Sequence, residues 1–296
     1  MLSSEKKRSF DGLLAAISAY SMWGFFSLYF TLLNRLDPLV ILAFRIIFAF
    51  VVLIPIVLIR GKGKTVVSQL LRRKSALSLL VSSFFISGNW LIFIILVQKK
   101  MVLESSLGYF INPLVSVMFG VVFLRERLRP LTWVCVFLAG CGVSFYAYEI
   151  GTVPWGAMGV ALTFACYGLV RKMNPTDSLS ALTVETLYVF PIAMLYLFRQ
   201  NAFFTIGKTE PMLFLLLFGC GVLTAFPLLL FGFAARRVRL STLGMLQYLT
   251  PTFSFLCAIV FLGETMQWFQ WVAFVITWFS LLLYLYDSFQ PYSDTA

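Results

Sequence analysis

Residues 103–126 read LESSLGYFINPLVSVMFGVVFLRE, and residues 240–264 read LSTLGMLQYLTPTFSFLCAIVFLGE. The two stretches first align at an offset of 136, and after a two-residue slip Pro113 aligns with Pro251 at 138. Solenoid repeats have periods of about 20–50 residues, so an offset this long predicts a duplicated half-protein. In an apolar chain, a duplicated half is typical of a transporter.

The composition is that of a membrane protein. The 296 residues are 60% hydrophobic and 12% charged, whereas soluble domains carry about 25% charged residues. Apolar stretches of about 20 residues are long enough to cross a bilayer as helices, and barrel strands would alternate polar and apolar side chains. We therefore predict an all-α membrane protein with two longer loops, at 60–75 and 200–210. Its ten transmembrane helices are expected at 11–33, 38–59, 76–97, 103–124, 131–148, 154–171, 180–199, 211–234, 240–262 and 268–286.

Lysine and arginine are distributed unevenly over the loops of this pattern. If the N-terminus lies inside, 17 of the 23 basic residues fall in cytoplasmic segments and five in outer loops. The positive-inside rule then places both termini in the cytoplasm. The net charge of +11 thus indicates membrane topology and contact with anionic lipid, and no nucleic-acid partner is expected.

The ten helices divide into two halves, residues 1–150 and residues 151–296. Trp23 of the first helix corresponds to Tyr167 of the sixth, at an offset of 144. Because five crossings end on the side opposite their start, the second half enters the membrane inverted. Inverted repeats give a protein two near-equivalent packings, open to either side, with the substrate near the midplane between them.

Two matched polar stripes lie beside the prolines of the repeated stretch. Their members recur at i, i+3 and i+7, on one helical face, and are Tyr109, Asn112 and Ser116 in the first half and Gln247, Thr250 and Ser254 in the second. Pro113 and Pro251 each remove a backbone hydrogen bond and are predicted hinges. We expect the stripes to line a substrate cavity. The alternative is that they join neighbouring helices by hydrogen bonds.

A second group of candidate cavity residues is aromatic or carries an amide. Tyr20 and Trp23 share a face of the first helix, and Tyr167 is placed similarly on the sixth. Asn89 and Trp90 interrupt the third helix far from its ends, where an unpaired amide is costly. For the aromatic residues, cavity wall and ordinary helix packing are both open.

Two charges fall inside predicted helices, Arg45 and Glu185. A charge within a membrane helix indicates a functional site by default. Their depths differ too much for a mutual salt bridge, and local pairing is as plausible as binding of substrate or protons. The nearer ionic partners are Glu104 or Asp37 for Arg45, and Arg171 or Lys172 for Glu185.

Glu126 and Glu264 also correspond between the halves, and each precedes the next helix. Acidic groups are stabilised near helix N-termini by the helix dipole. We therefore expect these two carboxylates to cap helices.

Several chemistries lack their residues in this sequence. The five cysteines lie in apolar stretches without a CxxC pair, which predicts neither a disulfide nor a metal site. Histidine and a GxSxG motif are absent, and Leu58 stands where a P-loop needs its first glycine. We expect no enzymatic activity and no cofactor.

The chain resembles the drug/metabolite transporter superfamily, specifically its RarD-type (chloramphenicol-sensitive protein) branch with two EamA repeats. The matching stretches are AAISAYSMWGFFSLYF at 15–30, GNWLIFI at 88–94, LESSLGYFINPL at 103–114, CYGLVRK at 166–172 and RLSTLGMLQYLTPT at 239–252. The resemblance implies a multi-pass permease of the bacterial inner membrane with both termini inside, and it suggests efflux.

From the residues and the resemblance together, we predict a secondary active transporter that works by alternating access without ATP. Its expected substrate is a small amphipathic metabolite or drug, because the cavity residues are aromatic rings, amides and hydroxyls with few charges. Proton coupling and either a monomeric or a homodimeric state are compatible with this function. The alternative is a passive facilitator or channel for small metabolites.

Overall fold

The computed structural model describes residues 4–33, 35–98, 102–151, 155–261 and 267–289, and every regular element in these ranges is an α-helix. The predicted all-α class is therefore confirmed. The helices are α1 (Ser4–Gly24), α2 (Phe26–Thr31), α3 (Pro38–Ile59), α4 (Gly63–Leu71), α5 (Arg73–Gln98), α6 (Val102–Leu124), α7 (Pro130–Ile150), α8 (Trp155–Met173), α9 (Ser178–Arg199), α10 (Ala202–Thr209), α11 (Pro211–Ala235), α12 (Leu240–Leu246), α13 (Leu249–Val260) and α14 (Trp268–Phe289).

Several helices begin where the sequence places a start signal. Pro38, Pro130 and Pro211 each occupy the first turn of a helix, where the missing N–H has no intrahelical partner to lose. The Asp37 carboxylate accepts hydrogen bonds from two backbone N–H groups of α3, at 2.8 and 3.4 Å. Asp177 caps α9 in the same way, at 3.2 Å. The two equivalent helices therefore start with the same cap.

Eight segments of the described residues are long and apolar enough to cross a membrane. They match eight of the ten predicted helices, and the sixth and ninth predictions are not among them. The sixth, α8, packs between α5 and α6 and carries two basic residues in its last turn. The ninth is divided into α12 and α13. The count of ten spanning helices thus stays a prediction.

The two longer connections were expected to be loops, and this expectation was wrong. Residues 60–75 contain α4, and residues 200–210 contain α10. Each short helix connects the second helix of its half to the third and packs against α9. The connections are therefore also equivalent in the two halves.

The first predicted helix is interrupted at Phe25. The Ser254 hydroxyl donates a hydrogen bond to the Gly24 carbonyl oxygen at 3.0 Å. The Leu28 N–H bonds to the Phe25 carbonyl, three residues back, at 3.2 Å, which is the spacing of a 3₁₀ turn. A Cβ on Gly24 would overlap a phenylalanine side chain of α13. The break between α1 and α2 thus lies where this segment meets the other half.

The ninth predicted helix is interrupted at Gln247, four residues before Pro251. Proline has no N–H to bond the Gln247 carbonyl, and the Thr250 N–H bonds to it instead at 2.9 Å. This local tightening separates α12 from α13. The corresponding Pro113 lies inside α6, which continues without a break.

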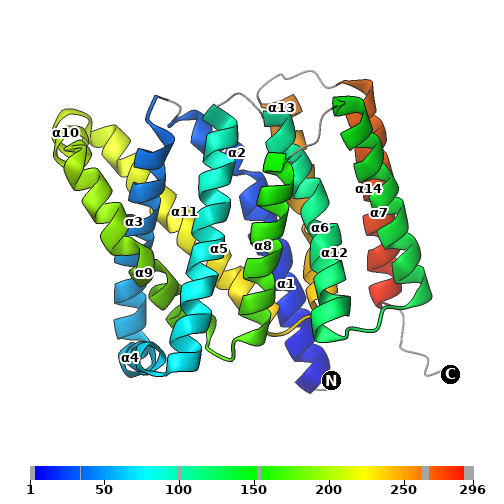
Figure 1. Ribbon diagram of the computed structural model, residues 1–296, viewed down its shortest axis with the longest axis horizontal. Helices are drawn as coiled ribbons and strands as arrows, with labels where there is room; N and C mark the ends of the chain where they lie inside the picture. The colour runs from blue at the N-terminus through cyan, green and yellow to red at the C-terminus, as the bar shows by residue number, and fades with distance from the viewer. Residues whose placement is uncertain (1–3, 34, 99–101, 152–154, 262–266, 290–296) are drawn as a thin grey trace.

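Packing between the halves is repeated pair by pair. The contact of α6 with α8 is equivalent to that of α13 with α1, and the contact of α5 with α8 to that of α11 with α1. The contact of α3 with α11 is likewise equivalent to that of α9 with α5. Three further pairs join equivalent helices: α3 with α9, α6 with α12, and α7 with α14. Figure 1 shows α3 and α9 crossing the molecule in opposite directions. The predicted inverted repeats are confirmed by this arrangement.

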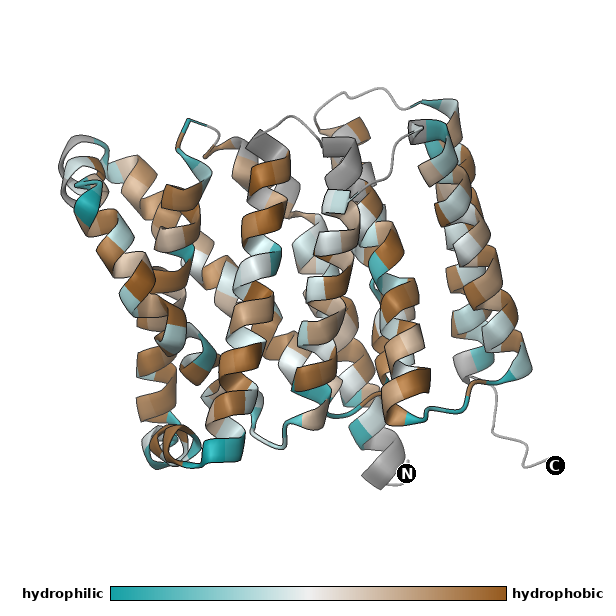
Figure 2. Cartoon of the chain, viewed as in Figure 1, coloured by the Kyte–Doolittle hydropathy of each residue, from teal (hydrophilic) through white to brown (hydrophobic). Residues whose placement is uncertain are grey.

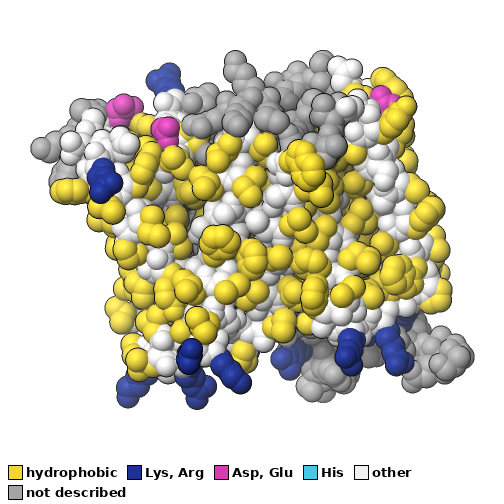
Figure 3. All heavy atoms as spheres, in the orientation of Figure 1, with side chains coloured by type: hydrophobic (Ala, Val, Ile, Leu, Met, Phe, Trp, Pro, Cys, Tyr) yellow, Lys and Arg dark blue, Asp and Glu magenta, His cyan; other side chains and the backbone are white. Residues whose placement is uncertain are grey.

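The surface of the bundle is banded. Hydrophobic residues dominate the middle of the helices and hydrophilic ones gather at the connections (Figure 2). In Figure 3, lysine and arginine line the lower edge, where Figure 1 shows that α1 begins and α3, α6, α8 and α14 end. We call this the basic end of the molecule and the other the opposite end.

Candidate functional site

Arg45 lies inside the bundle on α3, eight residues after the cap at the opposite end. The residue is 5% exposed. Its guanidinium carbon lies 4.8 Å from the ring centroid of Trp90 on α5 and 5.2 Å from that of Phe30 on α2. The guanidinium Nε donates a hydrogen bond to the hydroxyl of Thr224 on α11 at 3.0 Å. Four helices thus converge on one buried positive charge.

The rest of the Arg45 guanidinium group has no hydrogen-bond or ionic partner among the described residues. Its terminal nitrogens, Nη1 and Nη2, donate no hydrogen bond to a described residue, yet they are not among the fully enclosed unpaired polar atoms. No carboxylate of the described residues lies within salt-bridge distance. One predicted partner, Asp37, instead caps α3, and the side chain of the other, Glu104, lies outside the described residues. The terminal nitrogens therefore keep a small solvent-accessible surface.

Two further groups lie within electrostatic range of Arg45. They are the Tyr109 hydroxyl on α6 and the Cys220 thiol on α11. The Tyr109 ring also packs against Phe93, with centroids 5.8 Å apart. This predicted stripe residue is thereby brought to the same place as Arg45 and Trp90.

Glu185 lies on α9 and, unlike Arg45, forms an ion pair within the described part of the chain. Its carboxylate lies 3.5 Å from Arg171, one of its two predicted partners, and both side chains are 1% exposed. The Ser82 hydroxyl donates to Glu185 at 2.6 Å, and the Tyr167 hydroxyl donates at 3.5 Å. Local pairing is thus confirmed for Glu185. For Arg45, the structure excludes an ion pair with Asp37 and does not test one with Glu104.

The surroundings of the two buried charges correspond between the halves. Each charge lies eight residues after an aspartate cap, in α3 and α9 respectively. Each is bound by a hydroxyl on the third helix of the other half, Thr224 for Arg45 and Ser82 for Glu185. At 1.5 Å per residue, both lie about 12 Å from the start of their helix, Arg45 toward the opposite end and Glu185 toward the basic end.

Four members of the polar stripes bond to neighbouring helices or to each other. Asn112 donates to a backbone carbonyl of α8 at 2.6 Å, and Ser116 donates to Asn112 at 3.2 Å. Thr250 donates to the Tyr20 carbonyl at 3.1 Å, and Ser254 bonds α1 as described above. Three of these contacts join helices, as the alternative expects, and the bond between Ser116 and Asn112 lies within α6.

Gln247 is the remaining stripe residue and behaves differently. It is 3% exposed, and its side-chain amide makes no hydrogen bond to a described residue. It also lies at the break between α12 and α13. For Gln247 and Tyr109 the cavity role therefore stays a prediction, whereas the other four stripe residues are hydrogen-bonded to described residues.

Close helix contacts surround the repeated stretch. A Cβ on Gly108 would lie 3.0 Å from a backbone carbonyl oxygen of α8, and one on Gly244 would lie 2.8 Å from the Pro113 carbonyl oxygen. Both glycines therefore permit close backbone approach. The glycine that the two halves share in this stretch is explained by packing.

The predicted aromatic residues form one cluster beside Arg45. Tyr20 and Trp23 have ring centroids 5.7 Å apart, and both pack against Phe231 of α11. Tyr167 stacks on the same ring at 5.6 Å. Trp90 packs against this cluster as well. At one side of the cluster Trp90 contacts Arg45, and at the other the Tyr167 hydroxyl bonds to Glu185.

Asn89 serves the packing of α5 on α8. Its amide donates to a carbonyl of α8 at 2.8 Å and to the Thr163 hydroxyl at 3.1 Å. The partner that a buried amide requires is therefore present. Phe30 and Thr224, which contact Arg45, were not predicted, because only tertiary packing brings them to α3.

The basic end is held together by contacts between the halves. The Glu126 carboxylate, after α6, accepts hydrogen bonds from the backbone N–H of Leu240 at 2.6 Å and of Ser241 at 3.0 Å, and from the Ser241 hydroxyl at 2.6 Å. We call this contact the Glu126 latch. Glu126 was expected to cap the helix that follows it, α7, and this was wrong: it caps α12, which belongs to the other half. Its counterpart Glu264 lies outside the described residues.

Further bonds join helices at the same end. The Lys172 ammonium donates to the Val238 carbonyl. Asn174 donates to the Ser78 hydroxyl at 3.0 Å, and Thr176 donates to Gln69 at 2.9 Å. Together with the latch, these bonds close the bundle at the basic end.

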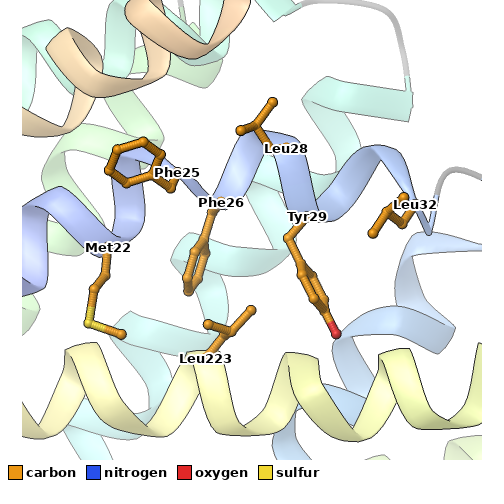
Figure 4. Close-up of a pocket in the computed structure, with 7 residues that line it drawn as sticks. All are labelled: Met22, Phe25, Phe26, Leu28, Tyr29, Leu32 and Leu223. Carbon is orange, nitrogen blue, oxygen red and sulfur yellow. The ribbon is translucent and has the colours of Figure 1, made fainter. Parts of the chain in front are cut away.

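Two open grooves lie on the surface away from these groups. One, of about 400 Å³, is lined by apolar side chains of α1, α2 and α11, and Figure 4 shows Phe26 and Tyr29 pointing toward α11 across it. The other, of about 880 Å³, lies between α1, α3, α9 and α11 near the basic end. Neither is lined by a predicted site residue.

Comparison with known proteins relates the sequence of this chain to transporters. The model of the EamA-like transporter family matches residues 11–148 and 151–286. Protein RarD of Salmonella typhi is 39% identical over 96% of this chain and 97% of its own, and Protein RarD of Escherichia coli K12 is 38% identical over 99% of both. A solved crystal structure covers 94% of this chain and 99% of its own, with a TM-score of 0.71 and 17% identity. That likeness concerns the fold.

Proposed function

Because the chain belongs to the EamA-like transporter family, we propose that it is a secondary transporter that exports small amphipathic molecules by alternating access. The chain is a multi-pass membrane protein, and a membrane transporter implies a small-molecule substrate and a lipid bilayer. The proposal adds to this the direction, the substrate class and the mechanism.

The main support for alternating access is the Glu126 latch, which joins the two inverted halves. Equivalent pairs of helices exist on both sides of the molecule, so the same interactions can favour either of two packings. In this structure the latch and its neighbouring bonds hold the basic end together. Breaking them while the halves rock would open that end. Residues 1–150 and 151–296 are then the two repeats that move against each other.

The proposed binding region lies between the halves, beside Arg45. Beside Arg45, Trp90 supplies an apolar face and Tyr109 a hydroxyl. The Gln247 amide, which bonds to no described residue, lies at the position equivalent to Tyr109 in the other half. This mixture suits a molecule with one polar and one apolar part. The break between α12 and α13, produced by Pro251, gives this region a place to bend.

The topology follows from the charges at the basic end. Loops rich in lysine and arginine stay in the cytoplasm, which supports a cytoplasmic basic end and both termini inside. For a bacterial relative of RarD, the membrane is the inner membrane. We further propose coupling to the proton gradient, with the monomer or a homodimer as the unit.

Counterflow in proteoliposomes tests alternating access. A thermal-shift screen of the purified protein first identifies ligands, because binding to the folded state raises its apparent stability. Liposomes loaded with the unlabelled ligand are then diluted into labelled ligand. A carrier produces a transient overshoot of label, whereas a passive channel equilibrates without one. Absence of the overshoot, with ligand flux intact, would refute the proposed mechanism.

Export and coupling need a separate measurement in everted membrane vesicles. We expect accumulation of the ligand in energised vesicles and its loss on addition of a protonophore. Accumulation that is insensitive to the protonophore would exclude proton coupling. Equal final concentrations on both sides would favour the passive facilitator.

A further inference from the structure

We infer that Arg45 binds the carboxylate of a monoanionic substrate whose apolar part packs on Trp90 and Phe30. For its place in transport, this inference rests on the proposed function above. The binding site itself is argued from the contacts of the buried guanidinium.

The first step is the missing counter-ion. A charge removed from water is costly unless it is paired and hydrogen-bonded. Arg45 is 5% exposed, and its neighbours are two aromatic rings and one hydroxyl. These groups offset part of the desolvation through cation–π contact and one hydrogen bond. An anion from outside the described residues would supply the remainder.

The second step is the geometry of the free donors. Thr224 occupies Nε, so the guanidinium is fixed in orientation and presents Nη1 and Nη2 side by side. Two parallel N–H groups match the two oxygens of a carboxylate in a bidentate pair. The terminal nitrogens are not among the fully enclosed polar atoms, so a carboxylate would approach them from their accessible side.

The third step is the number of charges. Helices α2, α6 and α11 contain no lysine or arginine, and Arg45 is the one basic residue of α3. One cation neutralises one negative charge, so a monoanion fits better than a phosphate dianion. The rings of Trp90 and Phe30 favour an apolar group next to the charged one.

The fourth step is the comparison with Glu185. Both charges lie at equivalent positions and each is bound by one hydroxyl of the other half. Glu185 has Arg171 as its counter-ion at 3.5 Å. Arg45 has no such partner among the described residues. Among the described residues, the buried charge therefore has an ionic partner in one half and none in the other.

The test compares carboxylates with their neutral amides. Purified protein is titrated with phenylacetate and phenylacetamide, benzoate and benzamide, and phenyl phosphate, with thermal shift and isothermal calorimetry as readouts. A hydrogen-bonded ion pair is worth about 1.5–3 kcal/mol, so the carboxylates should bind about 10- to 100-fold more tightly than the amides. Arg45→Gln should reduce this preference to about onefold.

Arg237→Gln is the matched control. Arg237 also stacks on an aromatic ring, that of Phe233 at 3.2 Å, but it follows α11 at the basic end. This variant should keep the full carboxylate preference. Thr224→Val retains the charge of Arg45 while removing its anchor, so carboxylate binding should weaken several-fold even where Arg45→Gln does not fold.

The inference would be overturned if the wild type bound carboxylate and amide equally, or bound no carboxylate at all. It would also be overturned if the preference for carboxylate over amide were unchanged in Arg45→Gln or Thr224→Val, or if phenyl phosphate bound more tightly than the carboxylates. The outcome is separable from that of the proposed function. Carboxylate binding without counterflow would refute alternating access and support this site. Counterflow of amides without a preference for carboxylates would support alternating access and refute this site.

Discussion

Removing the Glu126 latch should open the basic end of the molecule. The perturbation is Glu126→Ala, which deletes the acceptor of three hydrogen bonds to α12. A side-chain cap of this kind is worth about 0.5–2 kcal/mol. A carboxylate at a helix N-terminus adds about 0.3–1 kcal/mol through the dipole.

Because Glu126 is partly exposed, we take the lower part of these ranges, about 1–2 kcal/mol. If the latch is absent when the basic end is open, its loss shifts the equilibrium toward that state by a factor of about 5–30. Ser241→Ala removes one of the three bonds and should shift it less, because two backbone donors remain.

The assay is the labelling of a cysteine placed at Val117 in a cysteine-free background. Val117 is fully buried between α6 and α12, so a maleimide reaches it only when these helices separate. The labelling rate should rise about 5- to 30-fold in Glu126→Ala. The control is Glu149→Gln, since the Glu149 carboxylate bonds to no described residue. Rates within about twofold of wild type in Glu126→Ala would refute the latch.

Three other variants test separate features of the bundle. Glu185→Gln leaves Arg171 buried without its counter-ion and should destabilise the fold by about 3–5 kcal/mol; an unchanged midpoint of denaturation would contradict this. Gln247→Ala should lower transport without a loss of stability, whereas Thr250→Val should cost about 0.6 kcal/mol for one membrane hydrogen bond; wild-type transport in Gln247→Ala would remove it from the cavity. Gly244→Val should prevent monodisperse expression, because its Cβ would lie 2.8 Å from a backbone carbonyl of α6; normal gel-filtration profiles would show that the contact can relax.

The helices and their starts were predictable because their causes are local. Runs of apolar residues identify helices in a bilayer, where the backbone must satisfy its own hydrogen bonds. Asp37 and Pro38, which are adjacent in the chain, mark the start of α3. The same holds for the inverted relation of the halves, which follows from the repeat and an odd number of crossings. The helical content of 60–75 and 200–210 was missed, because short amphipathic segments have no long apolar run.

The breaks in two helices required the structure. Pro251 predicts a disturbance of its helix, and the structure shows a break four residues earlier, at Gln247. Nothing near Phe25 in the sequence predicts the end of α1. The hydroxyl that binds the Gly24 carbonyl comes from Ser254, 230 residues along the chain.

The polar residues divide in the same way. The sequence placed Asn112, Thr250 and Gln247 on equivalent faces of two helices. Only the structure separates Asn112 and Thr250, which bond to α8 and α1, from Gln247, which bonds to no described side chain or backbone group through its amide. Spacing along a helix defines a face, and the neighbouring helix decides whether that face is satisfied.

By itself, the sequence determined the all-helical membrane class, the duplication, the family and the presence of two buried charges, since composition, periodicity and charge placement are properties of the chain. The tertiary structure decided what each charge meets. Glu185 was brought to Arg171. Arg45 was brought to Thr224, Trp90 and Phe30, and no described residue bonds to its terminal nitrogens. These partners lie on different helices, and the packing of one half against the other determines which of them meet.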